Sequence, residues 1–314
     1  MNSFYTALSA VVPMFCMLAL GCFLRRINFL DEHTLNRMNK LCFKVFLAVN
    51  VYYNIYKVDL AEVFRPRLLI YAIAAQLLVL ALSILTAFPA EKGKKRRGAL
   101  AHSVFHTNFV IFGTLIGTAL CGEGNIGPIM LLVAVIVPLQ NVLAVILLEL
   151  SREGETKLDI KGMLLSVLKN PYVVAALAGF ATQLLGIRYP DFIANVFRDL
   201  GRCGTPVALI AMGGLFNFGS VKSNLKSLVV GCAARLVVIP AILLAITIAA
   251  GFRGAELVGL MCIFIAPVAT SSYNLATQMD SDGDLTSQMV VFSSVFCLVT
   301  VFLWIFFLSN LGVI

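Results

Sequence analysis

Apolar stretches of about 20 residues recur along the whole chain, and they restrict its fold more than any other feature. Leu68–Ala87 and Met289–Leu308 are the cleanest of these stretches. A helix that crosses the hydrocarbon core of a bilayer needs about 20 consecutive apolar residues. Of the 314 residues, 60% are hydrophobic and only 13% are charged, which is too little polar surface for a soluble domain. We therefore expect an integral membrane protein.

We predict an all-α fold with ten transmembrane helices, because an open sheet would leave backbone groups without hydrogen bonds in lipid. The second of these stretches matches the apolar pattern least well, because Lys44 interrupts it. No soluble domain is expected. The ten stretches cover residues 3–24, 36–56, 67–88, 99–121, 126–149, 170–187, 193–217, 223–250, 255–279 and 286–310.

The distribution of basic residues predicts the orientation of the chain in a plasma membrane. With both termini outside, 15 Lys and Arg residues fall at the cytoplasmic side and seven at the outer side. Cytoplasmic loops of membrane proteins carry this excess of positive charge. The basic run Lys92–Arg97 is therefore interpreted as a topology signal that contacts membrane lipids, and no nucleic acid is expected as a partner.

The ten helices divide into two sets of five, which predicts an inverted repeat. The expected units are a first repeat over 1–150, a cytoplasmic linker over 151–169 and a second repeat over 170–314. Since five is odd, the second repeat enters the membrane from the opposite side. Transporters commonly have this arrangement, with the substrate site at the interface between the repeats.

The fourth helix of each repeat contains residues that weaken helices, which predicts that both are broken and cross each other. Pro267 interrupts the ninth span, and Gly113 and Gly117, with Thr114 between them, lie in the fourth. A break exposes backbone N–H groups and the positive end of a helix dipole, and this environment suits an anion. We expect N–H groups around Thr114–Gly117 and around Ala269, Thr270, Ser271 and Ser272 to bind it. A simple proline kink with close glycine packing is the alternative.

A few polar residues within the spans are further candidates. Lys44 and Arg235 are basic residues inside apolar stretches, and such charges usually serve function in membrane proteins. His106 could respond to protons. We therefore assign these three residues a candidate role in ion or proton coupling, with snorkelling to the interface as the alternative for Lys44. No cofactor, metal or enzymatic activity is expected, because nucleophile, metal-ligand and nucleotide-binding motifs are missing.

Four segments carry a resemblance to a known family. In order along the chain they are LGCFLRRINFLDEHTLNRMNKLCF (20–43), NFVIFGTLIGTALCGEGNIGP (108–128), PLQNVLAVILLE (138–149) and APVATSSYNLATQMDSDGDLTSQMVVFSS (266–294). Together they resemble the auxin efflux carrier family, which includes plant auxin exporters and bacterial malate or malonate carriers. The bacterial type is the nearer match, because the long cytoplasmic loop of the plant exporters is missing.

The resemblance implies how the site is built. By analogy with the family, Asn108 and Asn141 line the substrate site and Pro267 is the crossover proline of the ninth span. The fourth-span pattern of the family carries its own proline where this chain has Leu115, so that break is expected to depend on the glycines.

The function expected is secondary transport of small organic carboxylate anions by alternating access, with the substrate held at the crossover. An anion sensor or receptor without transport, or a channel, remains the alternative. The partners expected are a small organic anion and membrane lipids, and a homodimer is left open.

Overall fold

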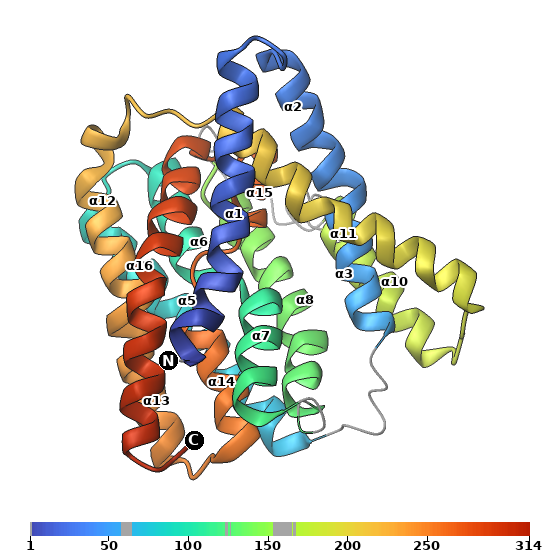
Figure 1. Ribbon diagram of the computed structural model, residues 1–314, viewed down its shortest axis with the longest axis vertical. Helices are drawn as coiled ribbons and strands as arrows, with labels where there is room; N and C mark the ends of the chain where they lie inside the picture. The colour runs from blue at the N-terminus through green and yellow to red at the C-terminus, as the bar shows by residue number, and fades with distance from the viewer. Residues whose placement is uncertain (1, 58–64, 123–124, 126, 153–164, 166–167) are drawn as a thin grey trace.

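The computed structural model describes residues 2–57, 65–122, 125, 127–152, 165 and 168–314, and these residues form an all-helical protein (Figure 1). Most of the predicted linker, residues 151–169, lies outside the described residues. Helical segments occupy every stretch that the apolar pattern predicts. The expected all-α fold is therefore confirmed over these residues, whereas the inverted repeat of ten helices stays a prediction.

In the first half of the chain the helices follow the predicted spans closely. The second span is helical throughout, but its middle is a five-residue π-helix that contains Lys44. The elements are α1 (Asn2–Arg26), α2 (Glu32–Leu41), the π-helix η1 (Cys42–Phe46), α3 (Leu47–Tyr56), α5 (Pro66–Ala90), α6 (Lys94–Phe105), α7 (Phe109–Cys121) and α8 (Gly127–Leu150).

The second half contains a second π-helix, η3 (Ala234–Val238), and this one contains Arg235. Both basic residues of the apolar stretches thus lie in π-helical turns, which occur frequently at functional sites. The other elements are α10 (Pro171–Leu184), α11 (Asp191–Gly214), α12 (Val221–Ala233), α13 (Ile239–Ala249), α14 (Gly254–Ile265), α15 (Ser271–Gln278) and α16 (Gly283–Asn310).

Among the described residues, four helical segments are long and apolar enough to cross a membrane on their own. They are α5, α8, the continuous Val221–Ala249 segment and α16, with mean hydropathies of 2.5 to 2.7. Three shorter helices, α7, α10 and α14, are apolar as well. Since α7 and α14 are each one part of a predicted span, their shortness follows from the interruption of those spans.

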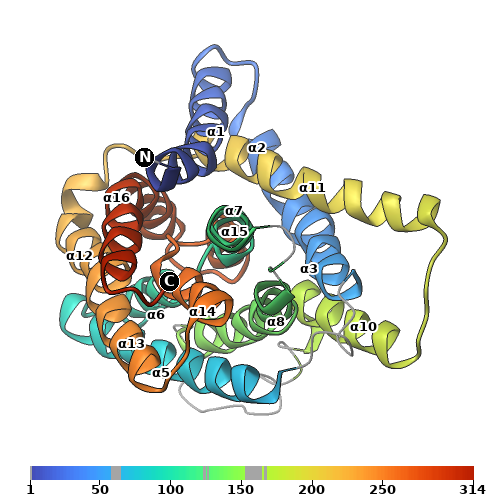
Figure 2. The same cartoon turned by 60° about the horizontal axis from the view of Figure 1, so that its bottom comes forward.

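The helices form two groups on either side of a central pair. Figure 2 shows α7 and α15 in the middle, α3, α10 and α11 on one side, and α12, α13 and α16 on the other. Two glycines let α11 approach the second span closely, because a Cβ atom at Gly201 would lie 3.0 Å from Cα of Asn50 and one at Gly204 would lie 2.8 Å from Leu47. α11 and α3 are therefore packed directly against each other.

A polar network joins the α5–α6 turn to two helices, α12 and α16, at one end of the molecule. Arg96, near the start of α6, pairs with Glu91 at 2.8 Å and with Asp282 at 3.0 Å, and it donates to Asn224 at 2.8 Å. Ser227 of α12 also donates to Glu91. The α5–α6 turn, α12 and the start of α16 are thereby held together by charge-assisted hydrogen bonds.

Candidate functional site

Two helices are interrupted, and their interruptions pair with each other. The first break separates α6 from α7 at residues 106–108, and the second separates α14 from α15 at residues 266–270. Thr107 and Val268 form an antiparallel bridge between the two extended segments. The Asn108 N–H donates to the Pro267 carbonyl at 2.9 Å, and the Ala269 N–H donates to the His106 carbonyl at 3.0 Å. Each break thus satisfies backbone groups that the other leaves without an intrahelical partner.

The predicted position of the second-half break is confirmed, whereas that of the first half is wrong. Pro267 lies within the interruption of the ninth span, as its missing N–H requires. Gly113, Thr114 and Gly117, in contrast, lie inside the continuous helix α7. The two glycines serve packing, because Cβ atoms there would collide with the side chains of Phe109 and Ile129.

A cavity of about 250 Å³ lies against the crossing of the two interrupted helices. It is enclosed by the starts of α7 and α15 on one side and by α3, α8, α10 and α11 on the others. Its lining residues are Leu47, Asn50, Val51, His106, Thr107, Asn108, Val110, Ile111, Val137, Asn141, Tyr172, Gly201, Arg202, Thr205, Ala269, Thr270 and Ser271. Predicted site residues Asn108, Asn141, Ala269, Thr270 and Ser271 are brought together here.

Backbone N–H groups at the start of α15 are available to a ligand in this cavity. In the described part of the chain, the N–H groups of Thr270 and Ser271 have no hydrogen-bond partner. The neighbouring groups are occupied, because the Ala269 N–H bonds to His106 and the Ser272 N–H bonds to Ala269. Ser272 does not line the cavity, and its hydroxyl lies 3.1 Å from Nδ1 of His106. The start of α15 is therefore suited to an anion.

Buried amides support the opposite wall of the cavity. Asn141 of α8 is buried and its Nδ2 donates to the Val137 carbonyl at 3.0 Å, which fixes the side chain against its own helix. Beside it, the Gln140 amide nitrogen donates to Thr107 at 3.1 Å and to Gln76 of α5 at 3.2 Å. The hydrogen bonds of Gln140 hold the 106–108 segment against α5 and α8.

Two histidines lie in contact at the edge of the cavity. Nε2 of His102 is 3.2 Å from Nδ1 of His106, and both rings are almost fully buried. His106 also lines the cavity, whereas His102 does not. One of these two nitrogens donates to the other, and which one does so depends on the tautomers of the two rings. The role of His106 in proton coupling stays a prediction.

Sequence reasoning missed two functional groups of the cavity, Arg202 and Tyr172. Arg202 is exposed, and none of its guanidinium nitrogens has a hydrogen-bond or ion-pair partner among the described residues. Tyr172 is 1% exposed and its hydroxyl has no partner either. Arg202 lies within the predicted seventh span, and it is one of the seven basic residues that the predicted orientation places at the outer side. The flanking glycines at 201 and 204 could have marked this turn as a close helix contact.

Comparison with known proteins decides the class of the protein. A family model described as a membrane transport protein matches residues 6–305. The chain belongs to the membrane transport protein family. This family comprises the auxin efflux carriers, so the resemblance read from the four segments is confirmed. It is a family of transporters and not of enzymes. No curated protein matches the chain.

Arg235 and Lys44 lie away from the cavity of this membrane transport protein. Arg235 is completely buried, and all its hydrogen bonds go to backbone carbonyls. Lys44 is exposed on η1. Neither residue lines the cavity at the crossover. Within the described ranges, no three His, Cys, Asp or Glu side chains group as metal ligands would.

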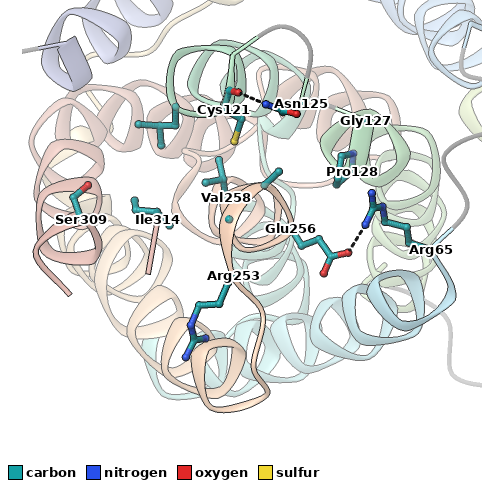
Figure 3. Close-up of a pocket in the computed structure, with 13 residues that line it drawn as sticks. Arg65, Cys121, Asn125, Gly127, Pro128, Arg253, Glu256, Val258, Ser309 and Ile314 are labelled. Atoms are coloured by element: carbon teal, nitrogen blue, oxygen red, sulfur yellow. Dashed lines mark hydrogen bonds and ion pairs between the residues drawn. The ribbon is translucent and has the colours of Figure 1, made fainter. Parts of the chain in front are cut away.

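A second, larger cavity of about 870 Å³ opens at the far ends of α7 and α14 (Figure 3). Figure 3 shows Glu256 pointing toward Arg65, and their ion pair measures 3.2 Å. Arg253 also lines this cavity, and its guanidinium donates to the carbonyls of Ile248 and Phe252. Both arginines of this cavity thus have hydrogen-bond partners, whereas Arg202 in the crossover cavity has none among the described residues.

Proposed function

We propose that this membrane transport protein is a secondary carrier that moves small organic carboxylate anions across the plasma membrane by alternating access. Residues 1–150 and 170–314 are the two inverted five-helix repeats, joined by a cytoplasmic linker over 151–169. Both termini lie outside. The fourth and ninth of the ten transmembrane helices are the interrupted pair, and the substrate binds where they cross.

The observation that carries this proposal is the chemistry of the crossover cavity. Its lining contains the unpaired Arg202 and the unpaired N–H groups of Thr270 and Ser271, and it contains no Asp or Glu. Asn108 and Asn141 add amide groups that can orient the rest of a bound molecule. Because donors and positive charge dominate, a carboxylate is the complementary ligand.

The size of the cavity limits the substrate to small acids. Its volume of about 250 Å³ lies below the roughly 300–1,000 Å³ of pockets that hold drug-sized ligands. Apolar side chains such as Val51, Ile111 and Val137 form part of the lining. A short carboxylic acid with some apolar surface is therefore the class of substrate that fits.

The position of the cavity supports alternating access. Asn50 and Arg202 belong to the group of α3, α10 and α11, whereas Asn108 and Ser271 lie at the starts of the central pair α7 and α15. A displacement of the central pair relative to that group would carry a bound anion past the wall formed by α3 and α11. Gating of one helix bundle against another is how repeat-built transporters expose a site in turn.

The test is flux of the acid across the membrane of proteoliposomes, measured as uptake and as export under an imposed potassium diffusion potential. Malate, malonate and indole-3-acetate are first screened by thermal shift, and the acid that stabilises the protein is used for flux. We expect saturable transport with counter-flow, and faster export of a monoanion at −100 mV inside, because one charge across 100 mV is worth about 2.3 kcal/mol. Binding without flux would indicate a sensor, and flux without saturation a channel. An export rate that is the same at zero and at −100 mV would contradict the transport of the anion alone, without a coupled ion.

A further inference from the structure

Arg235 of η3 is the one fully buried cation in the described chain, and its partners are unusual. The side chain is 0% exposed. Nε donates to the Ala266 carbonyl at 2.9 Å, and Nη2 donates to the carbonyls of Ile263 and Phe264 at 2.7 Å each. Nη1 donates to the Val104 carbonyl at 3.3 Å. No ion pair between Arg235 and a carboxylate occurs among the described residues.

These four carbonyls belong to the ends of two different half-helices. Ile263 and Phe264 lie in the last turn of α14, Ala266 is its C-cap, and Val104 lies in the last turn of α6. The last carbonyls of a helix have no intrahelical donor, and each helix end carries about half a negative charge. Two such ends together carry about one negative charge, which the single guanidinium balances.

In transporters with broken helices, unwound carbonyls and half-helix C-termini are the groups that coordinate a coupling Na⁺. Here the corresponding groups already hold a side chain. We infer that the Arg235 guanidinium permanently occupies the cation position formed by the carbonyl ends of α6 and α14, so that the crossover binds its anion without a sodium ion. This inference rests on the proposed function, since it specifies what balances the charges at the same crossing.

The charge balance of the crossing follows from this assignment. The C-terminal ends of α6 and α14 are neutralised by Arg235, whereas the N-terminal ends of α7 and α15 reach the cavity with about half a positive charge each. Together these two ends contribute about one positive charge at the cavity, in addition to that of Arg202. An arginine that only supplied hydrogen bonds would be replaceable by a neutral amide of similar length, whereas a resident cation would not.

The experiment measures the melting temperature of purified protein in nanodiscs, so it needs no substrate and is independent of whether transport occurs. The parent, Arg235→Lys and Arg235→Gln are compared in sodium chloride and in choline chloride at equal ionic strength. Lys44→Gln is the matched control, because it removes the other basic residue found in a π-helical turn, and that residue is exposed.

We expect the parent and Lys44→Gln to melt at the same temperature in both salts. Arg235→Lys should retain more stability than Arg235→Gln, and Arg235→Gln should regain at least about 2 °C in sodium chloride relative to choline chloride, because Na⁺ can then bind the bare carbonyls. A failure of Arg235→Gln to fold while Arg235→Lys folds would also support the need for a charge.

Two results would overturn the inference. One is a parent protein that is stabilised by sodium over choline, because the crossing would then use a Na⁺ in spite of Arg235. The other is an Arg235→Gln variant as stable as Arg235→Lys in choline chloride, because hydrogen bonding alone would then account for the residue. If neither variant folds, the salt comparison on the parent decides alone.

Discussion

Substitution of Arg202 by glutamine should weaken anion binding by about tenfold. Arg202 lines the crossover cavity opposite the start of α15, and its guanidinium has no partner among the described residues. A hydrogen bond to a charged group contributes about 1.5–3 kcal/mol. Because Arg202 is exposed, solvent screens its charge, and the lower end of that range applies. A loss of about 1.5 kcal/mol corresponds to about a tenfold rise in Kd.

Arg198→Gln is the matched control for this prediction. Arg198 lies on the same helix, α11, but it pairs with Asp199 at 3.0 Å and does not line the cavity. Isothermal calorimetry with the carboxylate found in the thermal-shift screen gives Kd for the parent and both variants. The Arg202→Gln effect should shrink as salt is added, because screening weakens exposed charges. Equal Kd values for Arg202→Gln and Arg198→Gln would refute the assignment of Arg202 to the substrate site.

Two further predictions concern the amides of the cavity and the polar network at the α5–α6 turn. Asn108→Ala and Asn141→Ala should each raise Kd by about tenfold to a hundredfold in the same calorimetric assay, and wild-type affinity in both would exclude them from the site. Arg96 holds the pKa of the Glu91 carboxyl below its usual value. The unfolded chain then binds the proton more readily, so this contribution to stability is complete near neutral pH and is lost as the pH falls from about 5 toward 3. The melting temperature should therefore fall less steeply with acid in Glu91→Gln than in the parent, and parallel curves would contradict this role of Glu91.

The two interruptions show what local sequence can and cannot predict. The break of the ninth span follows from the chemistry of Pro267, which lacks a backbone donor wherever it is placed. The break of the fourth span falls on His106, Thr107 and Asn108, and none of these residues excludes a helix. It arises from pairing with the segment around Val268, which is a tertiary contact. Glycine content consequently pointed to Gly113 and Gly117, which are packing positions.

The cavity shows a similar division. Asn108 and Asn141 were assigned through the family resemblance, and both do line the cavity. Arg202 and Tyr172 come from α11 and α10, and their contribution depends on how closely these helices pack against α3 and α8. Hydropathy indicates whether a residue is favourable in lipid, but it does not indicate which face of a helix lines a cavity between helices.

The pairing of the two interruptions also has a consequence for how the protein is made. His106 bonds to Ser272, which is 166 residues further along the chain. At about 5–20 residues per second, the ribosome needs roughly ten to thirty seconds to deliver that partner. Backbone N–H and C=O groups without hydrogen-bond partners are unfavourable in lipid throughout that time, since each unsatisfied group costs several kcal/mol. We therefore expect residues 99–121, which contain no proline, to enter the bilayer as one uninterrupted helix that opens at residues 106–108 once the second half of the protein has been inserted.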